Sequence, residues 1–312
     1  MSATGGSRAI FAALAANLGI AVAKFVAFLF TASSSMLAES VHSVADSGNQ
    51  ALLLVGRRRA QRPRTAQHPF GYGRERFFYA FIVAVVLFTV GSVFSLYEGW
   101  HKINDPHPVE SPAWAFGVLI FAIGLECYSF WTAIHESNRV RGRDGWVAFI
   151  RRSKAPELPV VLLEDLAALL GLIFALVGVG MAVVTHDGRW DGVGSMAIGV
   201  LLGLVATVLA IETKSLLIGE SAHEDVERQI VAALEAGDEV ERVIHLRTEH
   251  IGPEELLVAV KIAVRHDDTA TDVARGIDAA ERRVRAAVPM ARLIYLEPDL
   301  YEVARQSDTT SG

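Results

Sequence analysis

The chain has 312 residues, of which 52% are hydrophobic, and a formal net charge of -6 at pH 7. A mean hydropathy of +0.34 is too apolar for a typical soluble enzyme and indicates several membrane spans. The negative charge argues against nucleic acid as a partner, and the single cysteine, Cys127, excludes an intrachain disulfide and a cysteine-based metal cluster.

Six apolar stretches are each about 20 residues or longer, which suffices for a helix to cross a bilayer. The first has no small-residue cleavage site, so we interpret it as a span and not as a removed signal. It contains Lys24, which either snorkels to the interface or pairs with a carboxylate inside the bundle. The predicted spans are residues 9–30, 36–56, 77–100, 114–135, 158–185 and 192–211.

Arginine and lysine are distributed unevenly among the predicted loops. The loops after the second and fourth spans hold nearly all of these cations, whereas those after the first, third and fifth hold almost none. Because positively charged loops stay on the cytoplasmic side of a membrane, both chain ends are predicted to be cytoplasmic.

The second predicted span carries an unusual set of polar residues. Three, four and three positions separate Glu39, His42, Asp46 and Asn49, so a helix places them on one face. Ionisable side chains in a membrane helix are costly unless they are partnered, and an imidazole with a carboxylate is a ligand pair that divalent metals prefer. The alternative is that such a residue only forms a hydrogen bond with a neighbouring helix.

The fifth predicted span carries two adjacent carboxylates, Glu164 and Asp165. Neighbouring helical residues point roughly 100° apart, so both can hardly reach one ion equally. We expect His42, Asp46 and Asp165 to bind the metal, with Glu164 or Glu39 as fourth ligand or proton acceptor. Binding requires a neutral histidine and ionised carboxylates, so metal and protons compete, which is the chemical requirement for exchanging them.

Beyond residue 219 the pattern becomes that of a soluble domain. Its helix–strand–strand–helix–strand order predicts a small α+β open-faced sandwich with helices on one side of a sheet. The predicted elements are residues 223–236, 240–250, 255–265, 272–288 and 292–297. The predicted organisation is a transmembrane domain over residues 9–215, a cytoplasmic domain over 219–300 and a disordered tail over 301–312.

These features together resemble the cation diffusion facilitator family. The resemblance rests on six spans, on Glu39-Ser-Val-His-Ser-Val-Ala-Asp46, on the C-terminal domain and on the loop His68-Pro-Phe-Gly-Tyr-Gly-Arg-Glu-Arg76, which is similar to the family's His-Pro-Tyr-Gly-His-Gly-Lys. The Glu164–Asp165 pair looks most like the branch that contains the mitochondrial-type zinc transporters. The resemblance implies a homodimer, a ferredoxin-like cytoplasmic domain, and export of divalent metal against inward proton flow.

The sequence departs from the family pattern at three places. Val161 stands where many members have a histidine, four residues before Asp165, and Glu164 is our expected substitute. Tyr72 stands where a metal-binding histidine is often found; His68 remains as an accessory metal ligand or, alternatively, a loop histidine packed beside Pro69. Val260 and Tyr295 occupy positions where the later cytoplasmic strands often have histidines, so we expect no strong regulatory zinc cluster there.

The sequence thus predicts an α-helical membrane protein that exports divalent metal from the cytosol in exchange for protons. Zinc is the favoured substrate, and the oxygen-rich ligands also suit manganese, iron or cobalt. We expect no permanently bound cofactor, no enzymatic activity, a location in a bacterial cytoplasmic membrane, and membrane lipid and a second copy as partners. The alternative is a membrane-anchored metal sensor that binds without transporting.

Overall fold

The computed structural model describes residues 18–142 and 145–301. Residues 9–17 of the first predicted span and nearly all of the predicted tail lie outside the described residues. The chain divides into two compact units. One comprises the chain up to Arg62 and Glu75–Lys214, and the other comprises Pro63–Arg74 and the chain from Ser215 onward.

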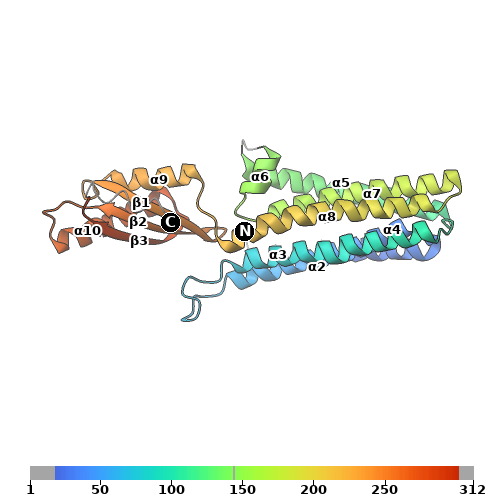
Figure 1. Cartoon of the computed structure of the whole chain (residues 1–312), viewed down its shortest axis with the longest axis horizontal. Helices are drawn as coiled ribbons and strands as arrows, with labels where there is room; N and C mark the ends of the chain where they lie inside the picture. Colours follow the sequence, from blue (N-terminus) through green and yellow to red (C-terminus); the bar gives the residue numbers. More distant parts are fainter. Residues whose placement is uncertain (1–17, 143–144, 302–312) are drawn as a thin grey trace. The chain divides into compact units, whose positions relative to one another are not determined.

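The first unit is a bundle of long helices (Figure 1). The third predicted span is one continuous helix over Glu75–Asn104, in which the seven residues of η1 have π-helical hydrogen bonding. The sequence did not indicate this π segment, nor the short helix α6 inside the basic loop. The bundle consists of Leu18–Thr31, α2 (Ser34–Ala60), α3 (Glu75–Val86), η1 (Leu87–Val93), α4 (Phe94–Asn104), α5 (Pro112–Arg141), α6 (Trp146–Arg152), α7 (Glu157–Thr185) and α8 (Arg189–Ile218).

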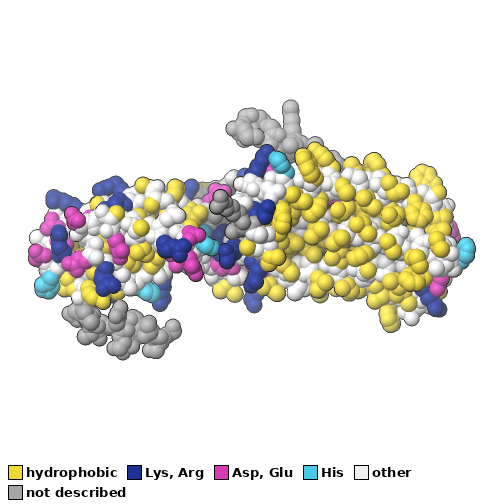
Figure 2. Space-filling view, turned by 90° about the horizontal axis from the view of Figure 1, so that it is seen from above, with side chains coloured by type: hydrophobic (Ala, Val, Ile, Leu, Met, Phe, Trp, Pro, Cys, Tyr) yellow, Lys and Arg dark blue, Asp and Glu magenta, His cyan; other side chains and the backbone are white. Residues whose placement is uncertain are grey.

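Four helices of the described chain are long and apolar enough to cross a membrane, namely Glu75–Asn104, Pro112–Arg141, Glu157–Thr185 and Arg189–Ile218. Large apolar side chains on this unit are exposed, among them Trp114 and Trp131 on α5. Figure 2 shows hydrophobic side chains covering much of one face of the helical bundle. At 27 residues α2 has the length of a span, but its five serines and its charged residues make it less apolar. The unit is therefore integral to a membrane, with its most polar helix largely buried.

The N-terminal end of α2 is fixed by one buried carboxylate of α8. Asp191 accepts hydrogen bonds from Ser33 Oγ at 2.8 Å and from the Ser34 backbone N–H at 2.7 Å, and its own carbonyl accepts from Ser35 Oγ at 2.8 Å. A negative charge at the N-terminal end of α2 also interacts favourably with the helix dipole. We call Ser33, Ser34, Ser35 and Asp191 the Asp191 cluster.

Small residues let α4 and its preceding π segment approach α8 closely. Ser92 Oγ donates to the Gly199 carbonyl at 2.7 Å, and Ser195 Oγ donates to the Ser95 carbonyl at 2.9 Å. A Cβ on Gly99 would lie 2.7 Å from the Gly192 carbonyl oxygen, so no larger residue fits there. Close packing of small residues with interhelical hydrogen bonds is how membrane helices associate without a hydrophobic driving force.

The second unit contains the predicted open-faced sandwich. The sheet order is β1-β2-β3, with β1 antiparallel and β3 parallel to β2. Alternate residues of β2, such as Leu256 and Val258, share one core with Ile230 of α9 and Val284 of α10, so both helices cover the same face. The elements are α9 (Glu224–Glu235), β1 (Arg242–Gly252), β2 (Glu255–Ala263), α10 (Ala270–Ala287) and β3 (Ala291–Asp299). The predicted fold class, a helical membrane bundle with a small α+β domain, is confirmed.

Candidate metal-translocation site

The polar face predicted for α2 is buried inside the bundle. The side chains of Glu39, His42 and Asn49 have no exposed surface, and Asp46 retains 16%. His42 Nδ1 lies 3.4 Å from Asp46 Oδ1, the ion-pair range expected for residues four apart on a helix. The helix thus brings an imidazole and a carboxylate together at a depth where neither is easily solvated.

Helix α7 contributes the two adjacent carboxylates, and each is held by a different neighbouring helix. Asn49 of α2 donates from Nδ2 to Glu164 Oε1 at 2.8 Å. Ser129 of α5 donates from Oγ to Asp165 Oδ2 at 2.9 Å. As expected for neighbouring helical residues, the two carboxylates find their hydrogen-bond partners on two different helices, α2 and α5.

The two halves of the site meet at a small cavity of about 20 Å³, enough for about one water-sized occupant. Asp46 lines it from α2, Glu164 and Asp165 from α7, and Glu126 and Ser129 from α5. From the sequence, Glu126 in the fourth span is expected either to line the ion path or to form an interhelical hydrogen bond, and the structure places it at the cavity. Ser129 was not predicted, although it lies three positions later and so on the same helix face. We call His42, Asp46, Asn49, Glu164 and Asp165 the acidic cluster.

Several atoms of the acidic cluster form no hydrogen bond with any described residue: both ring nitrogens of His42, Asp46 Oδ1 and Asn49 Oδ1. Buried polar atoms normally have hydrogen-bond partners. Neighbouring buried nitrogen and oxygen atoms that lack such partners therefore indicate a place where another species binds. Within the described ranges, no three His, Cys, Asp or Glu side chains converge closely enough to hold an ion as they stand. Asn49 and Ser129 hold the α7 carboxylates in their observed directions.

The two accessory residues lie in other surroundings. Glu39 forms a buried ion pair with Lys24, with Nζ 3.0 Å from Oε2, so of the two alternatives for Lys24 the structure has the pairing. His68 belongs to the second unit, where its exposed ring lies 4.5 Å from the ring of Tyr72. Neither residue lines the cavity of the acidic cluster.

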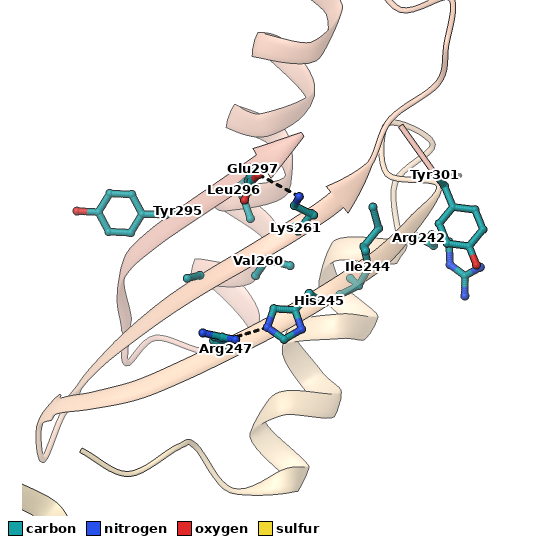
Figure 3. Close-up of a pocket in the computed structure, with 12 residues that line it drawn as sticks. Arg242, Ile244, His245, Arg247, Val260, Lys261, Tyr295, Leu296, Glu297 and Tyr301 are labelled. Carbon is teal, nitrogen blue, oxygen red and sulfur yellow. Dashed lines mark hydrogen bonds and ion pairs between the residues drawn. The ribbon is translucent and has the colours of Figure 1, made fainter. Parts of the chain in front are cut away.

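The open face of the β1-β2-β3 sheet carries a larger hollow of about 500 Å³ (Figure 3). His245 lies there, accepting at Nε2 a hydrogen bond of 2.7 Å from Arg247 Nε. Lys261 is 3.1 Å from both Asp299 and Glu297, and its hydrogen bonds to these carboxylates raise the pKa of Lys261. Val260 and Tyr295 occupy neighbouring strands, as expected from the sequence.

Carboxylates and an imidazole buried on neighbouring helices of a membrane bundle are typical of secondary ion transporters. The model of the cation efflux transmembrane domain matches residues 10–218. The chain therefore belongs to the cation efflux family, which confirms the resemblance noted from the sequence.

Three proteins with similar sequences agree with this assignment. The chain is 35% identical over 225 residues to the mitochondrial proton-coupled zinc antiporter of Xenopus laevis, covering 71% of this chain and 40% of that protein. It is 31% identical over 248 residues to metal tolerance protein C4 of Arabidopsis thaliana, covering 79% and 54%. It is 25% identical over 224 residues to the zinc transporter ZitB of Pectobacterium atrosepticum, covering 72% and 62%. The chain thus spans about two fifths to three fifths of the length of these relatives.

Among solved structures, the chain is similar to a nickel form of the MamM C-terminal domain. The identity is 24% and the TM-score 0.25, over 26% of this chain and 100% of that domain.

Proposed function

We propose that the protein exports divalent metal cations, zinc foremost, from the cytosol in exchange for protons. The observation that carries this proposal is the meeting of Asp46 of α2 with Glu164 and Asp165 of α7 on one buried cavity, beside ligand atoms without partners. The names of the zinc-transporting relatives support zinc, and the oxygen-rich residues extend the range to manganese, iron and cobalt.

In this proposal His42, Asp46, Asp165 and Glu164 bind the metal. Asn49 and Ser129 hold the two α7 carboxylates at the cavity, so in this proposal each carboxylate exchanges its hydrogen-bond donor for the ion when the ion enters. Protons compete with the metal for the same oxygens and nitrogen, so uptake of protons on one side of the membrane drives release of the ion there. Movement of helices about such a fixed site is the general design of secondary transporters.

The proposal also includes the location of the protein in the cell and its oligomeric state. The distribution of cationic loops supports cytoplasmic chain ends, and the sequence resemblance supports a bacterial cytoplasmic membrane and a homodimer. The mass of the protein–detergent complex, with the bound detergent subtracted, tests the homodimer.

The experiment is a flux assay in proteoliposomes that contain an internal pH dye. Zinc, manganese, iron and cobalt are offered in competition, and the expected result is metal movement in one direction with proton movement in the other. The Glu164→Gln variant should transport far more slowly if Glu164 substitutes for the histidine absent at position 161. Metal binding without flux would instead indicate the sensor.

A further inference from the structure

A buried lysine stands beside the acidic cluster. Lys24 lies in the helix Leu18–Thr31, and its side chain has no exposed surface. Its Nζ donates to Glu39 Oε2 at 3.0 Å and to Ser43 Oγ at 2.8 Å. An ammonium group inside a membrane is costly unless it is paired, and here one carboxylate and one hydroxyl satisfy it. The function proposed above has no role for this cation.

The position of Lys24 connects it to the metal pathway. Ser43, which accepts the hydrogen bond from Lys24, lines the same cavity as Asp46 and the α7 carboxylates. Ile20 also lines that cavity, four residues before Lys24 and therefore on the same face of its helix. A fixed positive charge is thus only one hydroxyl group away from a cavity formed by acidic side chains.

Lys24 also determines where Glu39 points. Glu39 shares the polar face of α2 with His42 and Asp46, so its sequence position suits a metal ligand. In the structure its Oε2 binds Lys24, and its Oε1 lies against Gly171 of α7, where a Cβ would overlap that oxygen. Glu39 is therefore held in a slot between two other helices and does not line the cavity.

We propose that Lys24 is a resident counter-cation that withholds Glu39 from the transported metal and so sets the affinity of the acidic cluster. The inference rests on the proposed function and deepens it. A transporter must bind its ion firmly enough to load it and weakly enough to release it. Asp46, Glu126, Glu164 and Asp165 already surround the cavity, and a further free carboxylate beside His42 would favour retention over release.

This role predicts opposite effects of two single substitutions. Lys24→Met keeps the length of the side chain but frees Glu39, so the zinc Kd should fall about tenfold and the rate of transport should fall with it. Glu39→Gln leaves the Lys24 charge without its counter-ion beside the cavity, so the zinc Kd should rise about tenfold. In the double variant Lys24→Met/Glu39→Gln both charges are gone, and the zinc Kd should return to within about twofold of wild type.

The experiment uses the full-length chain in detergent. Zinc binding is measured by competition with a chromophoric chelator, gel filtration reports the folded fraction, and proteoliposome flux is measured in parallel. Lys102→Met is the matched control, because Lys102 is a second buried lysine whose Nζ donates to the Ala32 carbonyl at 2.8 Å. Its zinc Kd should equal that of wild type. Lys24→Arg, which keeps the charge, should also remain within about twofold.

The outcomes distinguish a Lys24–Glu39 pair that sets the zinc affinity from a pair that only stabilises the fold. If Lys24→Met and Glu39→Gln shift the zinc Kd of the folded protein in the same direction, or not at all, the proposed role is wrong. If Lys24→Met does not fold, the double variant compared with Glu39→Gln decides: the proposal requires the zinc Kd to fall. A wild type that binds zinc without moving it contradicts the export function only, and one that binds none of the four metals overturns both.

Discussion

Two buried polar clusters on the same helix differ in how completely their atoms are satisfied. In the Asp191 cluster, at the N-terminal end of α2, both carboxylate oxygens accept hydrogen bonds from side chains and backbone. In the acidic cluster, farther along α2, both His42 nitrogens and one oxygen of Asp46 form no hydrogen bond with described residues. Two buried polar clusters can therefore have different roles. A cluster whose polar atoms all have hydrogen-bond partners holds helices together, whereas one with atoms that lack partners is available to a ligand.

The largest expected effect is at Asp46. Asp46→Asn keeps the shape of the side chain but removes the charge that we propose binds the cation, so zinc flux in proteoliposomes should fall at least about 100-fold. Gel filtration should show a folded protein. Asp105→Asn, on an exposed side chain after α4, serves as control and should transport like wild type. Undiminished flux in Asp46→Asn would remove Asp46 from the site.

The next effect is at Asp191, where stability should change and affinity should not. Asp191→Ala leaves the Ser34 and Ser35 backbone N–H groups and the Ser33 hydroxyl without their acceptor, at a cost of about 3 kcal/mol. The midpoint of thermal unfolding in detergent should fall. Zinc Kd measured on the folded fraction should stay at the wild-type value, and a weakened Kd would show that the two clusters are not separate in function.

A third prediction adds a ligand to the acidic cluster. Val161 lies one turn before Asp165 on α7, so Val161→His offers a nitrogen on the same face. Zinc prefers nitrogen ligands more strongly than manganese does, so selectivity for zinc over manganese should rise about tenfold. Competition between the two metals in proteoliposomes measures the change. A ratio equal to that of wild type would show that position 161 does not face the ion.

The smallest effect concerns an ion pair in the second unit, between Arg283 and Glu239. Partial burial raises the pKa of Glu239, but hydrogen bonds from the backbone and from Arg283 outweigh it, and the pKa lies below the ordinary 4.5. A lowered pKa in the folded state adds stability above the unfolded-state pKa, and this contribution is lost as the pH falls through the folded-state value. Glu239→Gln should therefore cost about 0.5 kcal/mol at pH 7, and nothing at a pH well below the lowered folded-state pKa.

Hydrogen exchange of the α9 and α10 amides in the full chain, corrected for the intrinsic pH dependence, measures this difference. Glu241→Gln, at an exposed neighbouring position, is the control. A difference for Glu239→Gln that persists in acid would mean that its effect is steric and not electrostatic.

Hydrophobic periodicity predicted the helices and strands because burial of one face fixes the period of the side chains. The buried polar face of α2 was predicted from spacing alone for the same reason. The partners across helices could not be predicted: nothing in the spacing of Asn49, Ser129 or Lys24 states which neighbouring helix each will face. The sequence left Lys24 with two alternatives, and only the packing of its helix against α2 distinguishes them.

The π segment η1 has a consequence for motion. Its wider turns store an extra residue in the third span, between α3 and α4. If η1 rewound to ordinary α-helical pitch, α3 would rotate by roughly 100° relative to α4 without any peptide bond leaving the helix. Since Gly99 and Ser195 hold α4 against α8, this rotation would turn α3 against α2, where Tyr79 packs on Gly56. A rewound η1 would therefore change which side chains of α3 face α2 while α4 stays in place.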